Sequence, residues 1–122
     1  MSQILNPKQG KQYDLEERTF LFAKRVNDYV NKLPKTVSNI ENGRQLVRAA
    51  GSVGANYIEA NEAMSKKDFK MRIKISKKEA KESCYWLKLT EPDQTEIKGK
   101  ESLITEATEL MKIFGSILEK TK

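Results

Sequence analysis

Apolar residues recur every three or four positions along most of this chain, and the pattern is clearest between residues 46 and 60. One face of a helix there collects the apolar side chains Leu46, Ala50, Val53, Tyr57 and Ala60. The opposite side carries a polar row of Arg48, Ser52, Asn56 and Glu59. Small residues between the two faces, Gly51 and Gly54 among them, allow close approach of neighbouring helices. The stretch therefore predicts a central helix of a bundle.

The same periodicity predicts four helices, over residues 14–33, 38–63, 66–90 and from about 99 almost to the end of the chain. Three of the predicted starts carry capping pairs, Asp14 with Glu17, Ser38 with Glu41 and Ser65 with Asp68. Residues 91–99, with Pro92 and Gly99, read as the longest loop. The predicted fold is all-α, an antiparallel up-down-up-down four-helix bundle in one domain over residues 14–122, after a flexible leader over residues 1–13.

The composition narrows the chemistry that this domain can perform. The chain of 122 residues has one cysteine, Cys84, and no histidine, so an intramolecular disulfide, a cysteine-based zinc site and a histidine-based triad lack their parts. We expect neither a metal nor a cofactor. Because no apolar segment reaches about 20 residues and no signal peptide is recognisable, we expect a cytoplasmic protein that does not enter a membrane.

The third predicted helix carries the whole net charge of the protein. Residues 66–88 hold nine basic and three acidic side chains, which matches the +6 of the full chain. Six lysines cluster on one side of this helix by the 3.6-residue period: Lys67, Lys70, Lys74, Lys77, Lys78 and Lys81. We call them the lysine ridge. It is either a surface that contacts the phosphates of RNA or DNA, or a solvated face that keeps the protein soluble.

The third helix also has more apolar surface than one core requires. Beside a first apolar row that includes Ile73 and Leu87, it carries a second row of Met71, Ile75, Trp86 and Leu89. We expect a subunit interface of a homo-oligomer to bury this second row, because monomers seldom expose contiguous apolar patches. The alternative is that the fourth helix covers both rows within one copy.

Two carboxylates, Glu79 and Glu82, lie among these apolar rows and need partners if they are buried. Arg44 and Arg48 of the second helix are the suggested counter-ions. The expected structural polar network comprises Arg44, Arg48, Ser52, Asn56, Glu59, Glu79 and Glu82. An enzyme using Glu79 or Glu82 as a general base is a weaker hypothesis, because no nucleophile, phosphate loop or metal motif accompanies them. We expect no catalytic residue and no enzymatic activity.

Two blocks of sequence carry a family resemblance, residues 44–60 (RQLVRAAGSVGANYIEA) and residues 65–87, which begin SKKDF and end KEAKESCYWL. They resemble the bacterial four-helix-bundle family named after proteins encoded in intervening sequences of large-subunit ribosomal RNA. The resemblance implies an antiparallel bundle that assembles into homopentameric rings. The family includes proteins similar to the accessory variability determinant of diversity-generating retroelements, a basic ring that binds nucleic acid and a reverse transcriptase. The resemblance supplies no catalytic residue.

Two functions compete at this point. The first is a non-enzymatic homo-oligomer, pentameric by resemblance, that binds the backbone of RNA or DNA through the lysine ridge. The alternative is a structural or adaptor protein that docks a protein partner, with the lysines serving solubility.

Overall fold

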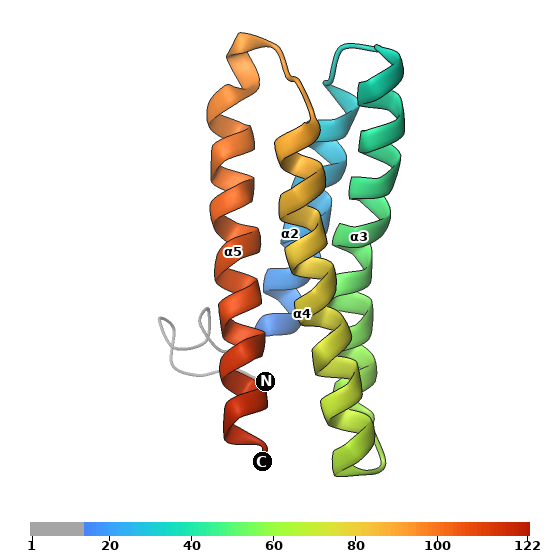
Figure 1. Ribbon diagram of the computed structural model, residues 1–122, viewed down its shortest axis with the longest axis vertical. Coiled ribbons are helices and arrows are strands. Elements are labelled where there is room, and N and C mark those ends of the chain that lie inside the picture. Colours follow the sequence, from blue (N-terminus) through green and yellow to red (C-terminus); the bar gives the residue numbers. More distant parts are fainter. Residues whose placement is uncertain (1–13) are drawn as a thin grey trace.

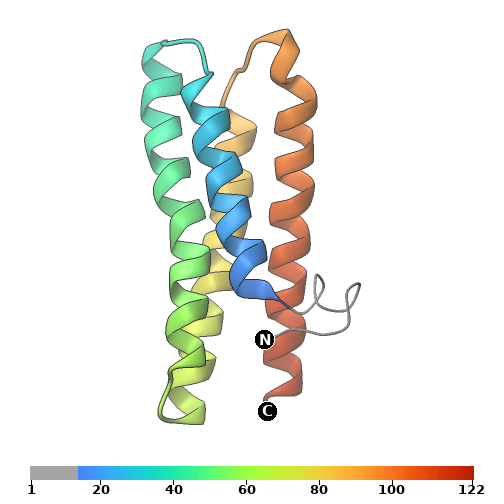
Figure 2. The ribbon, with the colours of Figure 1, turned by 180° about the vertical axis from the view of Figure 1, so that it is seen from behind.

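The computed structural model describes residues 14–122, which form four long α-helices and one short 3-10 helix (Figure 1). In chain order these are α2 (Leu15–Asn31), α3 (Val37–Asn61), α4 (Lys66–Leu89), η1 (Gln94–Glu96) and α5 (Ile97–Lys120). Consecutive helices run in opposite directions, and α2 also packs on α5, which closes the bundle (Figures 1 and 2). The predicted all-α, antiparallel up-down-up-down bundle is confirmed. The leader predicted over residues 1–13 lies outside the described residues.

The helix starts follow the predicted caps in two cases of three. The side chain of Asp14 accepts a hydrogen bond from the backbone N–H of Glu17, and Ser65 accepts one from Asp68. The predicted cap at Ser38 is wrong. Helix α3 begins two residues earlier because Thr36 has an extended backbone and its hydroxyl already accepts from the N–H of Asn39 at 3.1 Å.

The predicted loop at residues 91–99 is also too long. An extended segment after α4 leads through η1 directly into α5, which begins at Ile97 and takes Gly99 into its first turn. A glycine lowers helix propensity by only about 1 kcal/mol relative to alanine, so it does not by itself set a helix boundary.

The core lies along the axis of the bundle and draws large side chains from all four helices. Among the fully buried ones are Phe22, Leu46, Ile73 and Phe114. Two small polar residues of α4 are buried as well, Ser76 and Ser83, and the hydroxyl of Ser76 donates to the backbone carbonyl of Val53 at 2.9 Å. The hydroxyl of Ser83 donates to the carbonyl oxygen of Glu79 in its own helix at 2.9 Å. Both serines are therefore satisfied inside the packing face, and Ser76 links α4 to α3.

Asn39 joins the two connections at one end of the bundle. Its amide nitrogen donates to the carbonyl oxygens of Pro34 and Glu91, each at 3.0 Å, and its amide oxygen accepts from the N–H of Glu91 at 2.9 Å. The side chain is almost completely buried. One residue therefore satisfies backbone groups of the α2–α3 connection and of the segment that follows α4.

Glycines set the spacing between α2 and α3, which leads to a first prediction. A Cβ atom at Gly54 would lie 2.8 Å from the hydroxyl oxygen of Thr19, which is buried and bonded to the carbonyl of Leu15. A Cβ atom at Gly115 of α5 would meet only the end of the Lys77 side chain, at ordinary contact distances of 3.6 and 3.7 Å. We expect Gly54→Ala to lose about 1–3 kcal/mol through overpacking, partly offset by a gain of about 1 kcal/mol in helix propensity.

The matched control is Gly115→Ala, which gains the same propensity without a clash and should raise the free energy of unfolding by up to about 1 kcal/mol. Urea denaturation of both variants at one protein concentration measures the difference. Equal stability of the two variants would show that the close approach of α2 to α3 is not rigid.

Candidate functional site

The lysine ridge lies on the outer surface of α4. Five of its six members are exposed and Lys70 is half-buried. The side chain of Lys77 leans toward α5, where its Cε would lie 3.6 Å from a Cβ atom at Gly115. Within residues 14–122 the only ion pair made by a ridge lysine joins Lys78 Nζ to Glu79 Oε2 at 3.7 Å. The ridge is therefore a nearly uncompensated line of positive charge on one side of the bundle.

The second apolar row of α4 is only partly covered in one copy of the chain. Met71 and Leu89 are 47% and 42% exposed, while Ile75 and Trp86 are half-buried. Tyr85, which the sequence analysis did not assign to this row, is 59% exposed and packs edge-on against the ring of Trp86. Helix α5 packs on the other flank of α4, where Cys84 Sγ lies 3.4 Å from the hydroxyl of Thr108. The row at Met71 and Leu89 thus remains open to a partner.

A chain of hydrogen bonds connects α3 to α4 beside this row. Arg72 donates to the side-chain oxygen of Asn56 at 2.9 Å, and the amide nitrogen of Asn56 donates to the hydroxyl and the carbonyl oxygen of Ser52. Two members of the expected polar network, Ser52 and Asn56, therefore interact directly. Their cationic partner is Arg72, which sequence reasoning placed on α4 without giving it this role.

The suggested counter-ions of Glu79 and Glu82 do not pair with them. The guanidinium of Arg44 lies 3.2 Å from Glu41 on the exposed side of α3, and in the described part of the chain no ion pair within 4 Å joins Arg44 or Arg48 to either carboxylate. The side chain of Arg44 lies on the α2 side of α3, away from α4, so it does not meet either carboxylate. Glu59 is exposed on the same helix, with no hydrogen bond to the rest of the expected network in residues 14–122.

Arg48, Glu79 and Glu82 nevertheless share a small cavity between α3 and α4 of about 200 Å³. Its complete lining is Gln45, Arg48, Ala49, Ser52, Glu79, Glu82 and Trp86. The cavity holds charges of both signs. Over residues 14–122 no group of three or more potential metal ligands comes together.

Helix α2 is held to α5 by contacts that sequence reasoning missed. The guanidinium of Arg18 binds both oxygens of Glu106 at 2.7 and 2.9 Å and one oxygen of Glu109 at 2.8 Å. The hydrogen bond to Glu106 raises the pKa of Arg18 above its usual value. These residues lie 88 and 91 positions apart in sequence, so no local pattern could have predicted the pairing.

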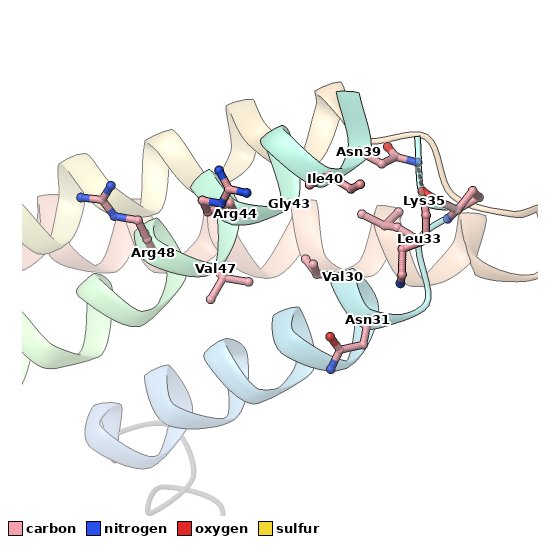
Figure 3. A pocket seen from close by; sticks show the side chains of 11 residues that line it. Val30, Asn31, Leu33, Lys35, Asn39, Ile40, Gly43, Arg44, Val47 and Arg48 are labelled. Carbon is pink, nitrogen blue, oxygen red and sulfur yellow. Dashed lines mark hydrogen bonds between the residues drawn. The ribbon is translucent and has the colours of Figure 1, made fainter. Parts of the chain in front are cut away.

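An apolar groove of about 410 Å³ runs between α2 and α3 (Figure 3). Its floor includes Val30 of α2, Leu33 of the α2–α3 connection, and Ile40 and Val47 of α3. Figure 3 shows Val30 and Val47 on its two sides. Its lining also includes three basic side chains, Lys35, Arg44 and Arg48. The groove was not predictable from the sequence pattern, because Ile40 and Val47 lie outside the main apolar face of α3.

None of the helices in the described part of the chain has the length and apolar character needed to cross a membrane. Together the fold and the surface define a small helical-bundle protein with one strongly basic helix and two exposed apolar faces.

The chain belongs to the family described as 23S rRNA-intervening sequence protein, whose model matches residues 11–116. It is also similar to a crystal structure of a protein of unknown function from the S23 ribosomal protein family of Bacteroides thetaiotaomicron. The two chains are 32% identical and superpose with a TM-score of 0.71, over 84% of this chain and 96% of the other. No curated protein matches the sequence. The family resemblance seen in the sequence is confirmed.

Proposed function

We propose that this protein is a non-enzymatic homo-oligomer, assembled as a pentamer, that binds the backbone of RNA or DNA in the cytoplasm through the lysine ridge of α4. The observation that carries the proposal is the ridge itself, six lysines on one exposed helix surface with a single ion pair at Lys78 among the described residues. Like charges three and four residues apart destabilise a helix by about 0.2–0.5 kcal/mol per pair. A polyanion that neutralises them offsets this cost.

The oligomer is supported by the apolar surface next to the ridge. Met71, Tyr85 and Leu89 are all more than 40% exposed on α4. A second copy of the chain that covers these side chains would also bring a second ridge nearby, so that assembly multiplies the number of phosphate contacts. The name of the family, which refers to 23S rRNA, points to RNA as the first nucleic acid to test.

The test is a fluorescence anisotropy titration of labelled single-stranded and duplex RNA and DNA of one sequence, at 50 and 200 mM salt. With about six phosphate contacts per copy, the affinity for duplex DNA should fall roughly 10³-fold between the two salt concentrations. Sequence should matter little, because phosphate contacts carry no base information. Absence of binding at 50 mM salt, or binding that salt does not weaken, contradicts the proposal.

The alternative function, an adaptor that docks a protein, predicts a different result. The protein would then bind no nucleic acid at 50 mM salt, and purification from its own cells would return one protein in a fixed ratio. The apolar groove between α2 and α3 keeps this alternative open, because a groove of this kind can receive a helix or an extended peptide.

A further inference from the structure

The apolar groove between α2 and α3 continues as an apolar strip along the outer surface of α3. Ile40, Val47, Gly51 and Ile58 fall on one line of the helix, with spacings of seven, four and seven residues. Ile40, Val47 and Ile58 are between 36% and 48% exposed, and a Cβ atom at Gly51 would meet open space. Beside this line, Phe20 of α2 is exposed one turn after Glu16, which contacts Asn61 of α3. This strip has no cover within residues 14–122.

Helix α4 carries a line with the same spacing. Met71, Lys78, Glu82 and Leu89 are also seven, four and seven residues apart, with exposed apolar side chains at both ends. Glu82 has no ion pair within 4 Å among the described residues, although it lines the cavity beside Arg48. We call this line the α4 face. Both lines span the same number of helical turns, so one can lie along the other over its whole length.

We propose that the groove between α2 and α3 is the docking site for the α4 face of a second copy of this chain. The inference rests on the proposed homo-oligomer and specifies which two surfaces meet. Because the groove and the α4 face are different surfaces, the contact is head-to-tail. Each copy inserts its α4 face into the groove of one neighbour and receives the α4 face of another in its own groove. The two surfaces lie on either side of α3, so successive copies turn relative to one another and the assembly curves toward a closed ring.

The charges fit one register of this contact. Copies related by rotation about an axis along the bundle keep their helix directions, so α3 and α4 run antiparallel between copies as they do within one (Figure 2). With the ends of the two lines matched, Leu89 lies opposite Ile40 and Met71 lies opposite Ile58. Glu82 then falls opposite Val47, between Arg44 and Arg48 of the neighbouring copy.

This register gives Glu82 a cationic partner that it lacks within one copy. Arg44 can change partners, because its present ion pair with Glu41 is exposed and exposed pairs contribute little to stability. Lys78 falls opposite Gly51, where the missing side chain leaves room for its aliphatic stem while the ammonium group reaches water. The counter-ions of Glu82 that the sequence suggested are thus supplied between copies.

The test mixes two variants that each lose one surface. Val47→Glu places a charge in the groove, and Met71→Glu with Leu89→Glu removes the apolar ends of the α4 face. Met64→Glu is the matched control, because Met64 is 95% exposed in the turn between α3 and α4 and lies outside both surfaces. Circular dichroism verifies that each variant folds, and Ile40→Glu replaces Val47→Glu if that variant does not.

Sedimentation velocity should find each surface variant monomeric alone, the control assembled like the wild type, and an equimolar mixture of the two surface variants as a dimer that grows no further. The dimer forms because one variant keeps an intact α4 face and the other an intact groove. A mixture that stays monomeric while the wild type assembles overturns the head-to-tail contact and leaves the proposed oligomer intact. A monomeric wild type overturns both.

The pairing of charges has a separate readout. Arg44→Glu and Glu82→Arg should each weaken assembly at least roughly tenfold, and the double variant should recover most of the loss. Losses that simply add in the double variant overturn the assigned register.

Discussion

Reversing the charge of three lysines in the ridge should abolish most of the affinity for nucleic acid while the fold stays intact. The variant Lys67→Glu, Lys74→Glu, Lys81→Glu removes three phosphate contacts from each copy and replaces them with repulsion, while Lys78, which belongs to the α4 face, stays unchanged. We expect at least roughly 100-fold weaker binding at 50 mM salt and a salt slope lower by about three. Anisotropy titrations over a series of salt concentrations measure both quantities.

The control for this variant keeps the total charge equal. Lys24 of α2 and Lys98 and Lys120 of α5 are exposed on other helices of the bundle. Reversing these three changes the net charge by the same amount, so it separates the local contacts from the overall field of the protein. If both triple variants lose affinity equally, the ridge is not the binding surface.

Thermal unfolding adds an independent readout to the same variant. Removing like charges three and four residues apart should leave α4 unchanged or slightly more stable, by about 0.2–0.5 kcal/mol for each repulsive pair relieved. A gain in stability together with a loss of binding would indicate that the ridge is kept for function. A large loss of stability would instead mean that the lysines are structural.

Replacing Asn39 should have the largest effect on stability. Asn39→Ala removes three hydrogen bonds at once and leaves the N–H and C=O of Glu91 and the C=O of Pro34 without this partner. At about 0.5–1.5 kcal/mol for each bond, the free energy of unfolding should fall by about 2–4 kcal/mol. Urea denaturation measures the loss, and thermal melting should show a midpoint roughly 10 °C lower.

Two further variants sharpen this prediction. Asn39→Asp has nearly the same shape and keeps the acceptor for the N–H of Glu91, but it turns an oxygen toward the two carbonyls that Asn39 now binds, so it should lose most of the same stability. Asn27→Ala, at an exposed position of α2, should stay within about 0.5 kcal/mol of the wild type. If Asn39→Ala matches Asn27→Ala, the two connections do not depend on this side chain.

The helices and their inward faces were predictable because they depend on local periodicity. The buried positions of α2 and α5, such as Phe22 and Phe114, follow directly from the 3.6-residue spacing of apolar residues. The boundaries were less predictable. Thr36 and Ser38 are both chemically suitable caps, and only the backbone conformation decides between them.

The surface of the bundle was predictable only in part. The lysine ridge lies on a single helix, so the spacing of lysines in the sequence was enough to predict it. The partners of Arg18, Arg44 and Arg72 depend on how each helix is rotated against its neighbours, which a single sequence does not specify. The groove between α2 and α3 depends on two helices and on the absence of a side chain at Gly43, where a Cβ atom would lie 2.9 Å from Val30.

In the proposed assembly, further copies of the chain cover the exposed apolar faces of the bundle. Light scattering coupled to size exclusion, at micromolar concentrations of the full chain, measures the mass of the assembled particle directly. We expect a closed assembly at five times the 14.0 kDa mass of one chain, unchanged on dilution within this range. A well-folded particle with the mass of a single chain would rule this assembly out.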